Sequence, residues 1–301
     1  MRTVSPGWLS AFLPFGLLFG LWGCSRDRGL TLTPILPATT GDLQTAASRD
    51  SSQLAFVHYP GDSLLPGLYV LDLRSGTARH LTGEYTANPS WSPDGRSLAY
   101  SATGDFLLTV LRLGDLSATR LTTYAAACPT WSPAGDRLAY CAWRSGGQRS
   151  LRLMQADGTG AIDLCPRDST EYLYPSWSPD GQRLLHTEWG PGMTQPEVVI
   201  MGVDGVGRQR LTSDGICDES PMWSSDGSRI VWVRLIGSTQ SIWLMNIDGT
   251  NPHQLTVGRD PAWLGTQEIV YSSTIDGYAY SLRAIRPNGT GSHPITYHVL
   301  P

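Results

Sequence analysis

The side chains of this chain that could do chemistry are its loop acids, six histidines and five cysteines. Glu171, Glu188, Asp218 and Glu219 could supply a pair of carboxylates for acid–base work on a glycan or peptide. The histidines are scattered without metal-ligand spacing, and Asp-Gly turns offer too few oxygens for calcium. The sequence has no Gly-x-Ser-x-Gly or His-Glu-x-x-His motif and no phosphate-binding glycine loop. We expect no catalytic residue, metal or cofactor, and keep a carboxylate-based enzyme as the alternative.

The cysteines could form disulfides, which are common in oxidising compartments. Cys128 and Cys141 lie equally far outside Trp131 and Leu138, on two short apolar segments that one turn joins. If Trp131 faces Leu138 on paired strands, the two cysteines face each other as well. We therefore expect a Cys128–Cys141 disulfide, with free buried thiols as the alternative.

A repeated pattern positions all of these side chains. A tryptophan, a Ser-Pro-Asp-Gly-like turn and a short apolar strand recur, and the tryptophans are spaced 40, 46, 46 and 40 residues apart. The repeat residues are Trp91, Trp131, Trp177, Trp223 and Trp263, with turns at Asp94, Gly95, Asp180, Gly181, Asp226 and Gly227. A degenerate copy without tryptophan begins at Ala47, and each copy closes on a Leu-Thr-like pair. Each interval holds about four short strands, which predicts an all-β, six-bladed propeller of four-stranded antiparallel blades.

The repeat has a physical basis. In the turn, proline presets φ, aspartate bonds nearby amides and glycine takes a positive φ. The tryptophan before the turn can fill the wedge between neighbouring blades. Because a single blade cannot cover both of its faces, the copies must stack into a ring.

The N-terminal segment indicates export. Residues 1–23 combine Arg2 with an apolar run from Trp8 to Trp22, which is too short for a transmembrane helix and typical of a signal peptide. The run ends in Leu21-Trp22-Gly23-Cys24, which resembles a bacterial lipobox and implies lipidation of Cys24, with an ordinary signal peptide as the alternative. Acyl chains on that cysteine would anchor the protein to a membrane. Residues 24–42 read as a tether, and residues 43–301 as the propeller.

The Trp-Ser-Pro-Asp-Gly copies resemble the PD40 repeat of TolB-like propellers, over about residues 43–301. The resemblance implies protein–protein contact in envelope maintenance without catalysis. TolB carries an additional α/β domain before its propeller, for which residues 24–47 leave no room, so a role in a Tol–Pal system is not carried over. Similar propellers accompany the hydrolase domain of prolyl-oligopeptidase-like enzymes, and a remnant of such a peptidase is a further alternative.

Charge and loop composition limit the classes of partner that the protein could bind. The net charge is −4, the pI is about 5.8 and no basic patch is visible, which argues against nucleic acid. The predicted blades 3 to 5 carry the richest loops, and long loops with aromatic and charged side chains are typical of binding surfaces. The candidate binding residues are Trp143, Arg144, Tyr172, Tyr174, Glu188, Trp189, Glu219 and Arg234. We expect an extracytoplasmic monomer, lipid-anchored at the outer membrane or cell surface, that binds an envelope protein, peptide or glycan. The alternative that the tryptophans pack against their own blades stays open.

Overall fold

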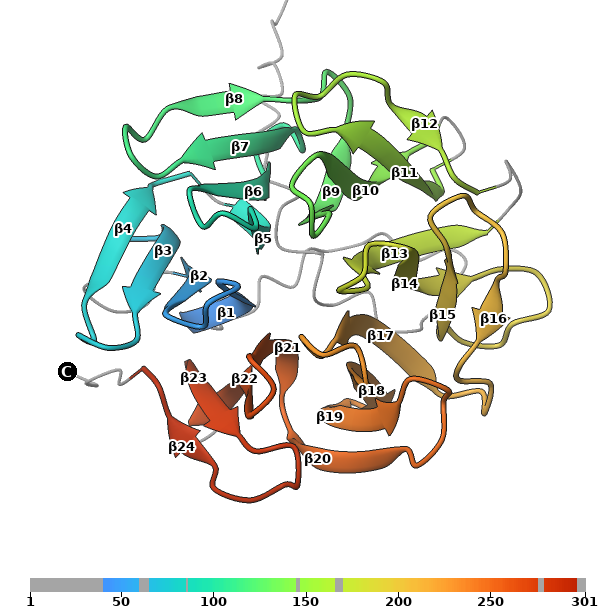
Figure 1. Ribbon diagram of the computed structural model, residues 1–301. Helices are drawn as coiled ribbons and strands as arrows, with labels where there is room; N and C mark the ends of the chain where they lie inside the picture. The colour runs from blue at the N-terminus through green and yellow to red at the C-terminus, as the bar shows by residue number, and fades with distance from the viewer. Residues whose placement is uncertain are drawn as a thin grey trace, which may run out of the picture.

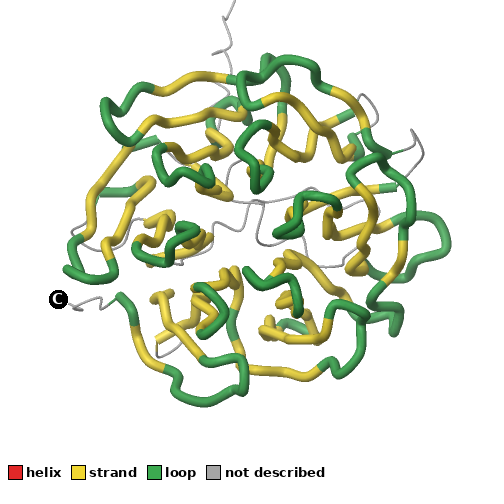
Figure 2. Tube along the Cα trace, viewed as in Figure 1, coloured by secondary structure: helices red, strands yellow, loops and turns green. Residues whose placement is uncertain are grey.

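The computed structural model describes residues 40–59, 65–84, 86–144, 147–165, 170–275 and 279–296. Six four-stranded antiparallel sheets stand around a central axis (Figure 1), and these residues form strands and loops without a helix (Figure 2). The predicted six-bladed propeller is confirmed. Within these ranges no helix has the length and apolar character to cross a membrane. The predicted signal peptide, Cys24 and most of the predicted tether lie outside the described residues.

The strands follow one another blade by blade, from the innermost to the outermost. Blades 1 and 2 comprise β1 (Thr40–Ala47), β2 (Gln53–Tyr59), β3 (Gly67–Asp72), β4 (Ala78–Thr82), β5 (Thr86–Trp91), β6 (Ser97–Ala102), β7 (Leu108–Arg112) and β8 (Ala118–Arg120). Blades 3 and 4 comprise β9 (Ala126–Trp131), β10 (Arg137–Trp143), β11 (Arg149–Gln155), β12 (Ile162–Asp163), β13 (Glu171–Trp177), β14 (Arg183–Trp189), β15 (Glu197–Gly202) and β16 (Gln209–Arg210). Blades 5 and 6 comprise β17 (Cys217–Trp223), β18 (Arg229–Ile236), β19 (Thr239–Asn246), β20 (His253–Val257), β21 (Arg259–Leu264), β22 (Glu268–Ile275), β23 (Ala279–Ile285) and β24 (His293–Pro294). Strand β1 thus begins slightly before the domain boundary predicted at residue 43.

Among the described residues, the four strands of every blade are continuous in sequence. Blades 6 and 1 meet through a short parallel bridge in which Thr40 pairs with Ala279 and Gly41 with Tyr280. We call this contact between the first and last blades the seam. The strand considered at residues 30–33 lies outside the described residues.

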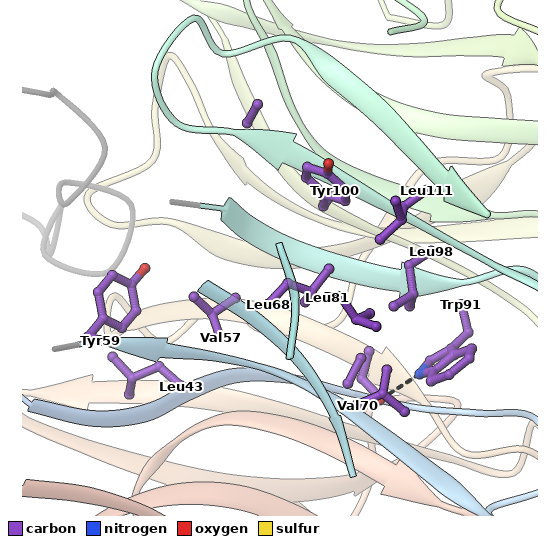
Figure 3. Packing of buried hydrophobic residues seen from close by; sticks show 13 residues of the cluster. Leu43, Val57, Tyr59, Leu68, Val70, Leu81, Trp91, Leu98, Tyr100 and Leu111 are labelled. Carbon is purple, nitrogen blue, oxygen red and sulfur yellow. Dashed lines mark hydrogen bonds between the residues drawn. The ribbon is translucent and has the colours of Figure 1, made fainter. Parts of the chain in front are cut away.

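The predicted turns and wedges are present. Gly95, Gly181 and Gly227 have φ values of 69°, 71° and 72°, as the repeat requires. The indole Nε1 of Trp91 donates to the carbonyl of Ala46 in the preceding blade at 2.9 Å (Figure 3).

The same bond recurs further round the ring, where Trp177 and Trp223 donate to the preceding blade at 3.1 and 3.2 Å. Ala47 occupies the tryptophan position in blade 1, so the seam has no indole wedge. An aromatic wedge with a bonded N–H both fills and orients a blade interface.

An arginine six residues after the tryptophan adds a second contact between blades, which the sequence reasoning missed. Its guanidinium lies over the tryptophan of the next blade: Arg137 over Trp177 at 5.1 Å, Arg183 over Trp223 at 5.1 Å, and Arg229 over Trp263 at 5.3 Å. The recurrence of arginine at this position in three copies was a usable signal. These cation–π contacts stiffen the interfaces of blades 3 to 6.

The predicted Leu-Thr pairs lie within the last strand in blades 1 and 5, whereas in blades 2, 4 and 6 they follow it and hold the outer edge through side-chain bonds. Thr212 Oγ1 accepts a hydrogen bond from the Val198 amide at 3.0 Å, while the Leu211 amide donates to the Val198 carbonyl at 2.8 Å. Thr122 and Thr296 repeat the hydroxyl bond, at 3.1 and 3.0 Å. Because the hydroxyl replaces a main-chain acceptor, β8, β16 and β24 end before the pair.

Candidate functional site in the central channel

Each innermost strand carries a β-bulge three residues before the tryptophan position. The bulged residues all have left-handed backbone, with φ values from 49° to 54°, and none is glycine. We call them the channel ring: Gln44, Asn88, Cys128, Tyr174, Ser220 and Asp260. Such backbone is uncommon for these residue types, and both it and β-bulges gather at functional sites.

The channel ring borders a central cavity of about 380 Å³. The cavity is lined by all six ring residues and by residues of the Trp-Ser-Pro turns. Arg49 and Asp260 are the charged side chains among its lining residues. The Arg49 guanidinium, in the first turn of blade 1, donates to the Pro133 carbonyl in blade 3 at 3.3 Å and so spans part of the rim.

Hydrogen bonds link the channel ring from blade to blade. Asp260 Oδ2 accepts from the Gln44 amide at 3.3 Å, and Gln44 Oε1 accepts from the Asn88 amide at 3.0 Å. The Cys128 thiol then donates to Asn88 Oδ1 at 3.5 Å. The bulge frees these amides from the strand ladder, and polar side chains of the preceding blade satisfy them. The polar side chains of the channel ring therefore have a structural role, in addition to any role in binding.

Three of the four loop acids considered as catalytic carboxylates are engaged in ion pairs. The pairs are Glu171 with Arg149 at 3.0 Å, Asp218 with Arg234 at 2.8 Å, and Glu188 with Arg208. In each pair the guanidinium already occupies carboxylate oxygens that a substrate would have to reach. These acids are therefore built into the blades rather than presented to a substrate.

Glu219 differs from the other three acids. No salt bridge involves it among the described residues. Burial raises its pKa to about 7, helped by the charges of Asp260 and Asp218 and opposed by Arg259 and Arg149. A carboxyl that titrates near neutrality is one component of acid–base catalysis. Asp260, the acidic side chain that lines the cavity, is paired with Arg259 at 3.0 Å.

Cys128 and Cys141 lie together, but the predicted register and bond differ from the structure. Trp131 does pair with Leu138, whereas Cys141 faces Ala127 because the bulge at Cys128 shifts the register by one residue. The two side chains still touch, and the Cys141 thiol donates to the Cys128 sulfur. Both are free thiols here rather than a disulfide.

The candidate binding residues separate into two groups. The first group is partly exposed and consists of Trp143, Arg144, Trp189, Tyr174 and Glu219. Of these, Tyr174 lines the central cavity.

The side chains of Tyr172, Glu188 and Arg234 are only 3%, 1% and 6% exposed. Tyr172 packs beside the ring of His186, and Arg234 stacks over Trp243 at 4.7 Å while it pairs with Asp218. These three residues therefore contribute to the packing of the blades. They lie in strands β13, β14 and β18, which extend into segments that the sequence analysis assigned to loops. No group of three or more histidine, cysteine or acidic side chains in the described ranges could hold a metal.

The channel ring itself was missed from the sequence, although a signal was present. A proline follows the ring residue in five of the six copies, two residues before the tryptophan, as in Asn88-Pro89 and Tyr174-Pro175. A residue before proline avoids right-handed helical backbone. Only the paired strands show that this residue bulges into the channel.

Comparison with known proteins agrees with the repeats. The family model described as the TolB β-propeller domain (PD40) matches residues 29–267. Among solved structures, a TolB-type protein from Agrobacterium tumefaciens is 21% identical with a TM-score of 0.66, over 76% of this chain and 87% of that one. TolB from Acinetobacter baumannii is 18% identical with a TM-score of 0.65, over 81% of this chain and 60% of that one.

An enzyme shares the fold as well. An oligogalacturonate lyase in complex with manganese is 14% identical with a TM-score of 0.56, over 82% of this chain and 89% of that one. No curated protein sequence matches the chain. At these identities the solved structures show a common fold and leave the activity to be argued from the site.

Proposed function

Because the chain belongs to the TolB β-propeller domain family, we propose that it is a non-catalytic binding module that holds a protein or peptide partner at the cell envelope. The observation that carries this proposal is the channel ring, whose polar side chains border a cavity of about 380 Å³. The pairing of Glu171, Glu188 and Asp218 with arginines supports binding over catalysis. A glycan is the other ligand class that such polar groups suit.

The cavity offers an extended peptide two kinds of contact. Its volume falls within the range of ordinary ligand pockets, roughly 300–1,000 Å³. The tryptophans and prolines of the turns give apolar walls, and the ring supplies hydrogen-bonding groups. At the rim, the exposed Arg49 carries the one positive charge among the lining residues, which favours an acidic residue in the partner.

The anchor and location belong to the same proposal. Lipidation of Cys24 would place the propeller outside the cytoplasm on a tether of residues 24–42, as a monomer, which suits the sequence Leu21-Trp22-Gly23-Cys24. The variant Cys24→Ser should move the protein from the membrane to the soluble fraction. An unchanged distribution would contradict the lipid anchor without bearing on the channel.

The test of binding is a crosslinking pulldown from the native envelope with wild type and three variants. Arg49→Glu reverses the charge at the cavity rim. Arg96→Glu makes the same change at an exposed arginine outside the cavity and serves as the matched control. Trp143→Ala combined with Trp189→Ala alters the opposite, loop-bearing end of the blades. All three changes leave the buried ion pairs intact.

We expect wild type and Arg96→Glu to recover one stoichiometric partner and Arg49→Glu to recover severalfold less, because reversing a rim charge weakens encounter with an acidic segment. Loss in the tryptophan variant alone would place the partner on the loop face instead. Failure of the folded, anchored wild type to recover any partner would contradict a binding module.

A carboxylate-based enzyme is the second candidate, and Glu219 is the observation that favours it. Its pKa of about 7 suits a general base at neutral pH, and the oligogalacturonate lyase shows that this fold can carry catalysis. Turnover of oligogalacturonate or a peptide by the purified domain, with an apparent pKa near 7 that Glu219→Gln abolishes, would establish it. A peptidase remnant would instead be inactive alone.

A further inference from the structure

Cys128 and Cys141 form a buried thiol pair in the channel wall that the proposed function does not use. Cys128 is the ring residue of blade 3, on β9, and Cys141 lies behind it on β10. The two side chains share a small cluster with Ala127, and Trp143 and Tyr174 pack against it. A thiol–thiol hydrogen bond already brings the two sulfurs together.

The two sulfurs differ in access. Cys128 is among the residues that line the central cavity and is 5% exposed, whereas Cys141 is fully buried. A reagent in the cavity therefore meets Cys128 first and reaches Cys141 only through it.

They differ in acidity in the same sense. The hydrogen bond from Cys141 lowers the pKa of Cys128, with help from the charge of Arg149. Burial raises the pKa of Cys141, and the hydrogen bond that it donates raises it further. The more accessible thiol is thus also the one that forms a thiolate more readily, and the thiolate is the nucleophile in exchange with a disulfide.

We propose that Cys128 and Cys141 are a redox-active dithiol, reached through the central cavity, which a small-molecule or protein disulfide oxidises to an intrablade disulfide. Cys128 attacks the external disulfide and Cys141 resolves the mixed disulfide. This site goes beyond partner binding and does not depend on which partner the channel holds.

The exchange balances in two steps. The Cys128 thiolate, having released its proton to water, attacks one sulfur of the external disulfide and expels a thiolate. Cys141 then loses its proton and attacks Cys128 Sγ, which forms the Cys128–Cys141 bond and expels the second thiolate. The two expelled thiolates take up the two protons, so two cysteine thiols are oxidised and one disulfide is reduced to two thiols.

Oxidation also changes the ring. The Cys128 thiol donates to Asn88 Oδ1 at 3.5 Å, and a disulfide has no proton to donate. Asn88 Oδ1 therefore loses this donor and becomes available to accept a hydrogen bond from a ligand in the cavity. The redox state of blade 3 thus sets the hydrogen-bonding groups that blade 2 presents to the channel.

Trypsin provides a direct readout because the chain has no lysine and Arg137 lies between the two cysteines. Cys128 lies in the peptide 121–137 and Cys141 in the peptide 138–144. The whole reduced protein is exposed to bis(2-hydroxyethyl) disulfide, alkylated and digested. We expect the two peptides to be joined after oxidation and to separate after dithiothreitol.

Two variants test the order of attack, and Cys165→Ser, which keeps both thiols, is the matched control that should react like wild type. In Cys141→Ser we expect one stable hydroxyethylthio adduct on Cys128. In Cys128→Ser we expect modification of Cys141 to be at least about tenfold slower than that of Cys128 in wild type, because burial suppresses thiolate formation. Circular dichroism confirms that each variant retains the β-sheet fold.

Three outcomes would overturn the proposal. One is full alkylation of both cysteines in the folded, oxidant-treated wild type. Another is a lasting mixed disulfide on wild-type Cys128 without the 121–137/138–144 link. The third is reaction of Cys141 in Cys128→Ser as fast as that of Cys128 in wild type. The wild-type digest decides the question even if a variant fails to fold.

Discussion

The acids around the channel fall into two groups according to what surrounds each carboxylate. Asp218 is the most completely bonded, because its two oxygens accept from Arg234 Nε, Arg234 Nη2 and Trp232 Nε1, each at 2.8 Å. Glu219, its neighbour in sequence, lacks such a donor set, and burial raises its pKa. One step along a strand turns the side chain to the other face, so adjacent acids meet opposite environments.

In the core of blade 4, opposing effects act on the pKa of His186. Its ring lies 3.4 Å from Glu188, a contact that by itself would favour the charged form. Burial and the positive charge of Arg208 outweigh that contact and lower the His186 pKa to about 3. The residue therefore stays neutral at physiological pH and packs in the position that Tyr100 and Tyr140 hold in sister blades.

At the residue scale, Glu219→Gln should change how stability depends on pH. Glu219 has an ordinary pKa of 4.5 and a folded pKa of about 7. Between these values the folded state binds the extra proton, so wild-type stability falls as pH rises from about 4.5 to about 7. The loss is at most roughly 3–4 kcal/mol, since the two pKa values differ by about 2.5 and one pKa unit corresponds to about 1.4 kcal/mol. Glutamine removes this loss.

Urea unfolding at pH 5 and pH 8 measures the effect. The variant and the wild type should have similar free energies of unfolding at pH 5, and the variant should be the more stable at pH 8. An equal difference at both pH values would mean that Glu219 titrates normally and that the substitution acts through packing alone.

Elements in this fold are short, and side chains complete their hydrogen bonding. Strands β12, β16 and β24 have only two residues each. Main-chain pairing with such short strands leaves some amides of the neighbouring strand without a main-chain acceptor. Threonine hydroxyls supply the missing acceptors at the outer edge, as polar ring residues do at the inner edge. Each blade is thus a strand ladder closed at both ends by side chains.

At the element scale, Thr212→Val should destabilise the protein by about 1–3 kcal/mol, because the Val198 amide loses its acceptor in a buried site. Thr256→Val, the equivalent change in blade 5, is the matched control. The Thr256 hydroxyl bonds only the carbonyl of Val257, and the longer β20 makes its own ladder. Denaturant midpoints at constant m-value compare the two, and equal losses would contradict a special role for Thr212.

The whole molecule is a ring whose interfaces are unequal. Tryptophan wedges and stacked arginines join successive blades, whereas the seam has Ala47 in place of the wedge and a two-pair parallel bridge. Asp260 reinforces the seam through the Gln44 amide, and its carbonyl accepts from Thr45 Oγ1 at 2.9 Å. An interface without a large aromatic wedge buries less apolar side chain, and we expect it to open more readily.

At the scale of the whole molecule, hydrogen exchange should therefore be fastest at the seam. We expect amides of β1 to exchange faster than those of β13, which lies within the wedged part of the ring. Asp260→Ala should speed exchange in β1 further, while Ser220→Ala, a ring change away from the seam, should not. Mass spectrometry of peptic fragments follows both strands, and uniform protection around the ring would contradict a weak seam.

The architecture followed from the sequence because its causes are local and repeated. The tryptophan spacing, the turn glycines and the Leu-Thr pairs each describe contacts within one blade or with its neighbour, so six copies predict six blades. The Trp131–Leu138 pairing was predictable for the same reason, since one short turn sets that register.

The channel required tertiary structure, because its residues meet only when the ring closes. A bulge is a property of two paired strands, so the left-handed ring residues and the one-residue shift between Cys128 and Cys141 were hidden in a single sequence. Likewise, the arginines that neutralise Glu171, Glu188 and Asp218 lie 16 to 22 residues away along the chain. The sequence determined which groups are present, and folding decided which of them are paired, buried or open to the cavity.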